Sequence, residues 1–164
     1  LGPDFFTLPC NTAHYFYDEL AKVVDVPILH MPKETVAEIK KRYPKAKKVG
    51  LVATQGTIRD QIYDKEILAA GYDLAKPSPA VQKMTDELIY DDIKEQDVVD
   101  GKLFHGLVAQ MIKETGCDVV ILGCTELSLA QEREPITDLP LVDSQSTLVD
   151  RTIEWADKTQ KSVS

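Results

Sequence analysis

The chain has 164 residues, which is enough for one ordinary domain with a hydrophobic core. Its apolar share of 43% and its charged share of 28% are typical of a globular protein. The net charge of −8 argues against a nucleic-acid-binding surface, and no apolar run is long enough to predict a membrane span.

Five short apolar runs predict β-strands. They are rich in β-branched residues and apolar on both faces, a pattern typical of strands that helices cover on both sides. The predicted strands are residues 5–8, 26–29, 48–53, 118–122 and 139–143.

Amphipathic segments between these runs predict helices, whose apolar stripes we interpret as core. Ser78 is a predicted N-cap, and Gly71 and Gly116 are predicted C-terminal stops. The stripes cover residues 58–70, 79–89, 103–112 and 148–156. The alternation of strands and helices predicts a parallel, doubly wound α/β fold that binds ligands at the carboxyl ends of its strands.

Two cysteines follow predicted strands in matched contexts: Cys10 in "LPCNT" and Cys124 in "LGCTE". At a helix N-terminus, unpaired N–H groups lower a cysteine pKa from about 8.5 toward neutrality and also attract a carboxylate. The matched contexts therefore predict a facing pair of reactive thiols. Cys117 stands at the entry of a strand, and we expect it to be structural.

The odd number of cysteines and their unpaired spacing favour a reducing cytoplasm over a disulfide framework. The scattered histidines and the absence of a CxxC or HExxH pattern give no support for a metal site. We therefore expect a cytoplasmic protein without a metal.

A third polar motif, "ATQGT", follows the predicted strand 48–53. Gly56 there allows the backbone to approach a ligand, and the hydroxyls of Thr54 and Thr57 offer groups for a carboxylate. An ordinary turn capped by one of these threonines explains the motif equally well.

The motifs "PCNTAH", "ATQGTI" and "GCTEL", in this order, resemble the aspartate/glutamate racemase family over nearly the whole chain. The resemblance implies two pseudo-symmetric α/β lobes with mainly parallel sheets, each of which contributes one cysteine. It also implies racemisation of aspartate, or of glutamate, by two bases without pyridoxal phosphate or another cofactor. One thiolate removes the α-proton while the opposite thiol delivers a proton to the other face. We also expect a homodimer with the amino acid as its only small-molecule partner.

The resemblance assigns roles to residues that match the family motifs. Cys10 and Cys124 match the catalytic pair. Glu126 replaces a histidine of the glutamate racemases of cell-wall synthesis, which favours the aspartate-type branch. The predicted substrate-binding residues are Asn11, Thr12, Thr54, Thr57, Lys94, Thr125 and Glu126. Lys94 resembles a family lysine that reaches the side-chain carboxylate, although a solvated helix end explains it too.

The resemblance also predicts the division into lobes. The first lobe comprises residues 1–26 and 137–164 and carries Cys10, whereas residues 27–136 form the second lobe and carry Cys124. Family members begin with a strand and a glycine-rich loop well before the first cysteine, but Cys10 is only the tenth residue here. We therefore expect the first lobe to be incomplete and to lack an arginine for the distal carboxylate.

Other functions remain open at this stage. Hydantoin racemase and maleate isomerase also use paired cysteines. A thiol hydrolase with Cys10 as nucleophile and His14 or His105 as base would leave Cys124 without a role. A catalytically incomplete fragment that only binds an amino acid is a further alternative.

Overall fold

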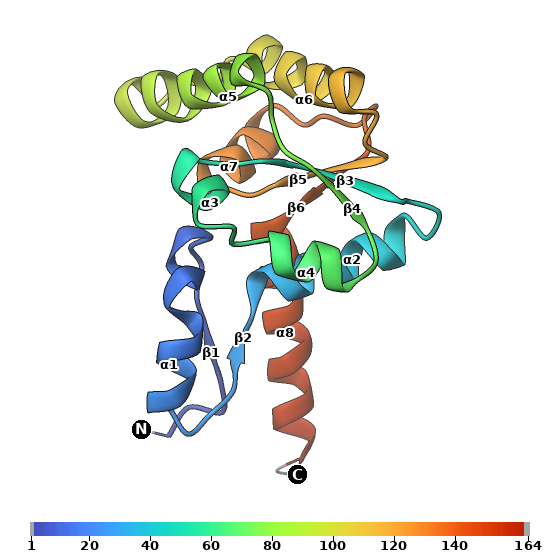
Figure 1. The fold of residues 1–164 in the computed structure, drawn as a ribbon. Coiled ribbons are helices and arrows are strands. Elements are labelled where there is room, and N and C mark those ends of the chain that lie inside the picture. The colour runs from blue at the N-terminus through green and yellow to red at the C-terminus, as the bar shows by residue number, and fades with distance from the viewer. Residues whose placement is uncertain (1, 163–164) are drawn as a thin grey trace.

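The computed structural model describes residues 2–162 and contains two parallel sheets (Figure 1). The strands are β1 (Phe6–Thr7), β2 (Ile28–Leu29), β3 (Lys48–Val52), β4 (Asp73–Ala75), β5 (Val119–Leu122) and β6 (Leu141–Asp143). The larger sheet has the order β4-β3-β5-β6, and the smaller sheet pairs β1 with β2. All of these pairings are parallel, which confirms the predicted α/β class.

Helices flank the sheets. The α-helices are α1 (Tyr17–Val23), α2 (Met31–Arg42), α3 (Gln55–Arg59), α4 (Asp64–Ala69), α5 (Pro79–Asp86), α6 (Gly101–Thr115), α7 (Thr125–Arg133) and α8 (Ser144–Ser162). A 3-10 helix, η1 (Thr12–Phe16), precedes α1, and a π-helix, η2 (Glu87–Lys94), follows α5. In Figure 1, α5 and α6 lie on one face of the larger sheet, and α2 and α4 lie on the other. No helix within residues 2–162 has both the length and the apolar character that a membrane crossing requires.

Strand β5 is the centre of the core because both of its faces are buried. Val120 and Leu122 belong to the apolar cluster that includes residues of α6. Val119 and Ile121 belong to the cluster on the opposite face, which includes residues of α2 and α4. All four side chains have no exposed surface. This two-sided burial explains why the sequence of the strand is apolar throughout.

Several predicted boundaries are confirmed, and others are wrong. The Ser78 hydroxyl caps α5 by accepting from the Val81 N–H at 3.3 Å, and Gly116 ends α6 in the left-handed conformation at φ 64°. The single helix expected over 58–70 is wrong: Gln61, at φ 54°, separates α3 from α4. Periodicity cannot reveal such a break because the apolar positions continue across it. Strand β4 was not predicted.

The strand pairing differs from the predicted lobe boundaries at two strands. Strand β2 falls within residues 27–136, but it pairs with β1. Strand β6 falls within residues 137–164, but it pairs with β5 in the larger sheet. An apolar run predicts that a strand forms, whereas the choice of neighbour depends on contacts between distant segments. The division of the chain into two lobes therefore stays a proposal.

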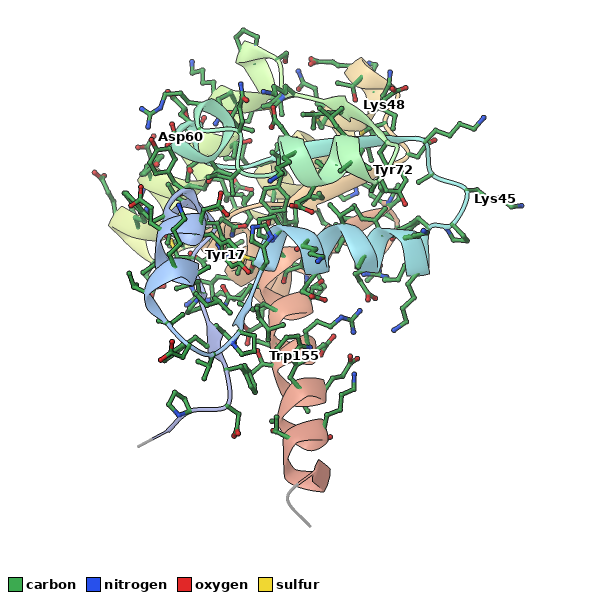
Figure 2. The ribbon with its side chains drawn as sticks, turned by 60° about the horizontal axis from the view of Figure 1, so that its bottom comes forward. Tyr17, Lys45, Lys48, Asp60, Tyr72 and Trp155 are labelled. Atoms are coloured by element: carbon green, nitrogen blue, oxygen red, sulfur yellow. The ribbon has the colours of Figure 1, made fainter. Side chains whose placement is uncertain are left out.

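Helix α8 contacts strands of both sheets, β2 in the smaller sheet and β6 in the larger one. It follows β6 directly and runs along β2, and its Trp155 packs edge-to-face on Phe5 with ring centroids 5.5 Å apart (Figure 2). The Arg151 guanidinium, whose side chain is 14% exposed, contacts Glu34 at 3.3 Å and Glu38 at 2.8 Å, both on α2. It also contacts Glu154 at 2.7 Å. One cation therefore forms ion pairs with three carboxylates where α8 meets α2.

We predict that Arg151→Met lowers the free energy of unfolding by about 1–3 kcal/mol, because it leaves these three carboxylates facing one another. The matched control is Arg133→Met, which removes the exposed pair with Asp97 and should cost about 0–1 kcal/mol. Urea denaturation at neutral pH measures both values. Equal losses in the two variants would contradict a role for Arg151 in joining α2 and α8.

Candidate active site

A pocket of about 140 Å³ lies where the carboxyl ends of β1, β3 and β5 meet. Its lining residues lie in the segments that follow these three strands and in η2: Cys10, Asn11, Thr12, Thr54, Lys94, Gly123, Cys124, Thr125 and Glu126. The structure thus brings both predicted thiols and all but one of the predicted substrate-binding residues to one place. The exception is Thr57.

Cys124 occupies the N-cap position of α7 and is 5% exposed. Its thiol Sγ donates to Glu126 Oε2 at 2.7 Å. Burial, together with the hydrogen bond and the negative charge of Glu126, raises the pKa of Cys124 to about 12. The N–H groups of Glu126 and Leu127 lower this pKa, but by less. The lowered pKa that we expected for Cys124 is therefore wrong, because burial and the carboxylate outweigh the helix N-terminus.

Glu126 is held by three donors. Its Oε2 accepts from Thr125 Oγ1 at 3.0 Å as well as from the Cys124 thiol, and Lys94 Nζ lies 3.3 Å from Oε1. Burial raises the pKa of Glu126, but these hydrogen bonds and the Lys94 charge lower it overall. The carboxylate is therefore ionised beside a neutral thiol. The sequence did not predict this contact between Glu126 and Cys124.

Lys94 reaches the pocket from the last turn of the π-helix η2. The wide turn is marked by the Glu95 N–H, which donates to the carbonyl of Tyr90, five residues earlier. π-turns occur often at functional sites because they rotate the following side chains away from the α-helical register. The Lys94 ammonium lies 4.7 Å from the centre of the Tyr90 ring, and its side chain is 45% exposed.

The other half of the pocket is built by the segment after β1. Cys10 is exposed, whereas Asn11 is 3% exposed. Thr12 Oγ1 lies 3.0 Å from Thr57 Oγ1, which accepts from Thr54 Oγ1 at 3.2 Å. Thr57 is fully buried and does not line the pocket, so it supports Thr12 and Thr54 from behind.

Gly123 lines the pocket but was not among the predicted site residues. A Cβ at this position would lie 2.9 Å from Leu51 Cδ1 and 3.1 Å from Ala53 Cβ, so only glycine fits without a shift. The signal in the sequence is the glycine directly before Cys124. Cys117, by contrast, is buried against Gly50 at the other end of the sheet, as expected of a structural residue.

Neither histidine of the hydrolase alternative lines the pocket. His14 Nε2 accepts from the Met31 N–H at 3.1 Å, so Nδ1 carries the proton and donates to the Cys10 carbonyl at 2.9 Å. Burial lowers the pKa of His14 and keeps the ring neutral. His105 lies against Asp138 at 3.0 Å. Both ring nitrogens of His14 are therefore occupied by backbone groups, so His14 is not placed to act as the base for the Cys10 thiol.

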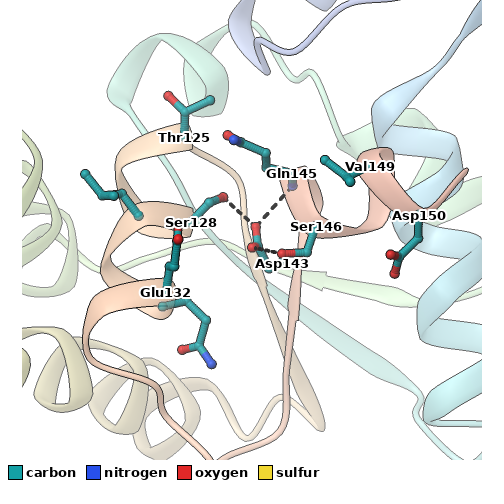
Figure 3. Close-up of a pocket in the computed structure, with 10 residues that line it drawn as sticks. Thr125, Ser128, Glu132, Asp143, Gln145, Ser146, Val149 and Asp150 are labelled. Carbon is teal, nitrogen blue, oxygen red and sulfur yellow. Dashed lines mark hydrogen bonds between the residues drawn. The ribbon is translucent and has the colours of Figure 1, made fainter. Parts of the chain in front are cut away.

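A larger cavity of about 440 Å³ adjoins the pocket and shares Thr125 with it (Figure 3). At its centre, Asp143 accepts from the Ser128 hydroxyl, from the Ser146 hydroxyl at 2.6 Å and from the Gln145 N–H at 3.1 Å. These bonds join α7 to the start of α8. No cysteine lines this cavity, whereas two line the smaller pocket. The smaller pocket is therefore the better candidate for the active site.

Comparisons with known proteins agree with this geometry. The family model described as Asp/Glu/Hydantoin racemase matches residues 1–152. The chain is 30% identical over 152 residues to the broad specificity amino-acid racemase RacX of Bacillus subtilis (strain 168), covering 93% of this chain and 64% of that protein. It is 28% identical over 153 residues to a glutamate racemase of Aquifex pyrophilus, covering 90% and 56% of the two chains.

The fold gives the same result. The Picrophilus torridus aspartate racemase superposes with a TM-score of 0.73 at 25% identity, over 95% of this chain and 63% of that chain. The chain therefore spans less than two thirds of the length of each of these relatives. Because the family model matches all but the last 12 residues, the chain belongs to the Asp/Glu/Hydantoin racemase family.

Proposed function

We propose that this protein racemises a small acidic amino acid, aspartate in the first place, by passing the α-proton between Cys10 and Cys124. The observation that carries the proposal is that the two thiols follow strands of different sheets and line one pocket together with hydrogen-bond donors. RacX, the Aquifex enzyme and the Picrophilus enzyme are named as amino-acid, glutamate and aspartate racemases, which supports the reaction class. The proposed reaction requires no pyridoxal phosphate.

The donors around the pocket support an acidic substrate. The hydroxyl of Thr12 and the Nδ2 donor of Asn11 suit the α-carboxylate, whereas Thr54 and Thr125 already donate their hydroxyl protons to Thr57 and Glu126. The Lys94 ammonium suits a second carboxylate. The pocket volume of about 140 Å³ suits a small substrate.

The proposed proton transfers balance as follows. The thiolate of one cysteine accepts the proton from Cα and becomes a thiol, and the carbanion takes a proton from the thiol on its other face, which becomes a thiolate. The Cys124 thiol, with its raised pKa, is the acid in the resting protein. When Cys124 acts as the base, its proton must leave beforehand. Glu126, which accepts the S–H hydrogen bond, is the adjacent acceptor, and its lowered pKa makes this transfer unfavourable in the resting protein.

We predict that Cys10→Ser and Cys124→Ser each reduce racemisation in both directions by about 10²–10⁴-fold, because every turnover uses both groups. Cys117→Ser is the matched control and should keep a rate close to that of the unaltered protein, since Cys117 lies outside the pocket. Circular dichroism follows the conversion of L- and D-aspartate. Near-normal turnover by Cys124→Ser would rule out the two-thiol reaction.

We further predict that Glu126→Gln lowers the pKa of the Cys124 thiol by about 1 to 2 units. The sign follows from the removal of a negative charge that now disfavours the thiolate. The measurement is the rate at which a small neutral thiol reagent modifies Cys124 at pH 8–9, in a chain that also carries Cys10→Ser and Cys117→Ser.

A lower pKa raises the thiolate fraction, so modification of Cys124 should become about 10–100 times faster. Glu132→Gln, on the same helix but outside the pocket, is the control and should leave the rate unchanged. An unchanged rate in Glu126→Gln would show that Glu126 does not govern the protonation of Cys124.

A further inference from the structure

The side-chain amide of Asn11 is buried, and only its oxygen has a hydrogen-bond partner among the described residues. Its Oδ1 accepts from the hydroxyl of Tyr63, and its Nδ2 has no hydrogen-bond partner within the described part of the chain. The residue is 3% exposed and lines the pocket. A buried donor without a partner costs about 1–3 kcal/mol in a folded protein. A ligand that accepts a hydrogen bond from Asn11 Nδ2 would remove this cost.

Tyr63 and Asn11 come from distant parts of the chain. It lies between α3 and α4 and is fully buried, whereas Asn11 follows β1 in the smaller sheet. The left-handed turn at Gln61 ends the preceding helix two residues before Tyr63. A non-glycine residue in this conformation costs on the order of 1 kcal/mol, which the surrounding structure must offset.

The hydroxyl of Tyr63 donates to Asn11 Oδ1. Two other hydroxyls, those of Thr35 and Ser144, lie beside it, and each donates to a backbone carbonyl at 2.8 Å. Burial raises the pKa of Tyr63, so its hydroxyl stays protonated and remains a donor. The Asn11 amide is therefore oriented by a group that does not line the pocket.

We propose that Tyr63 is a positioning residue: by donating to Asn11 Oδ1 it fixes the amide so that Nδ2 is presented as the donor to a substrate carboxylate. This inference rests on the proposed function of the pocket as an amino-acid site. It assigns a role in substrate binding to a side chain whose sequence pattern indicated only a core position. The proton transfers themselves do not involve Tyr63.

The test is the steady-state kinetics of Tyr63→Phe with L- and D-aspartate. Phenylalanine keeps the ring and removes only the hydroxyl, so KM should rise roughly three- to twelvefold while kcat stays within about twofold. Tyr43→Phe is the matched control: its hydroxyl donates to the Leu141 carbonyl at 3.3 Å, outside the pocket, and KM should not change. An unchanged KM in Tyr63→Phe, or equal changes in both variants, would overturn the proposal.

Two further variants separate positioning from a general structural effect. In an Asn11→Ala background, Tyr63→Phe should have no additional effect on KM, because the amide it orients is gone. Asn11→Asp keeps an acceptor for Tyr63 but loses the Nδ2 donor, so its KM should rise at least tenfold. Additive effects in the first case, or a normal KM in the second, would overturn the proposal.

A binding measurement keeps the inference testable if Tyr63→Phe does not fold, and it separates the inference from the proposed function. In the unaltered protein, the side-chain amide signals of Asn11 in a ¹H–¹⁵N NMR spectrum should shift when aspartate is added. A shift without racemisation would support the positioning of Asn11 while the proposed reaction fails. Racemisation without any shift of these signals would overturn the role of Asn11 and Tyr63 and leave the reaction intact.

Discussion

Two thiols that follow strands of two separate sheets can serve one substrate only if the sheets are fixed relative to each other. Apolar packing such as that of Trp155 on Phe5 contributes to fixing them, and polar contacts beside the pocket add to it. Tyr63 donates to Asn11, Thr57 lies 3.0 Å from Thr12, and the Met31 N–H donates to His14. Helix α8 adds a cluster of ion pairs around Arg151 further along the chain. The geometry of the site therefore depends on hydrogen bonds that join the segment after β1 to the larger sheet.

The two thiols lie in different environments. Cys10 is exposed, whereas Cys124 is buried beside an ionised carboxylate that keeps it protonated. A buried thiol that stays protonated is suited to act as the acid in a proton transfer. Lys94 partly neutralises Glu126, so a substrate carboxylate that draws Lys94 away would make Glu126 a stronger proton acceptor. Substrate binding and the activation of Cys124 are thus linked through one ion pair in this proposal.

The fold class and most of the pocket could be predicted from the sequence because both depend on local patterns. Within residues 2–162, apolar runs identified five of the six strands, and the pocket residues other than Lys94 follow three of these strands. Strand β4 could not be predicted from an apolar run because it is three residues long and only one of them, Ala75, is buried. The sheet in which β2 and β6 lie could not be predicted, since strand pairing depends on contacts between distant residues.

Side-chain chemistry was harder to predict than position. The helix N-terminus suggested a lowered pKa for Cys124, but the depth of its burial and the orientation of Glu126 decide the opposite sign. Thr57 has the right residue type for a substrate contact, yet it points into the core and supports its neighbours. Tyr63 fits the apolar stripe of a helix, and only the structure reveals where its hydroxyl goes. Each of these outcomes depends on a partner that is distant in the sequence or on an exact side-chain direction.

The central claim is that two different groups act on opposite faces of one substrate, and hydrogen isotope exchange tests it most directly. L-Aspartate is incubated with the protein in deuterium oxide, and early in the reaction the α-hydrogen of each enantiomer is determined by NMR or mass spectrometry. If one thiol removes the proton and the other delivers a solvent-derived deuteron, the D-aspartate formed carries deuterium while the remaining L-aspartate keeps protium. Equal early incorporation of deuterium into both enantiomers would indicate a single base and would contradict the account.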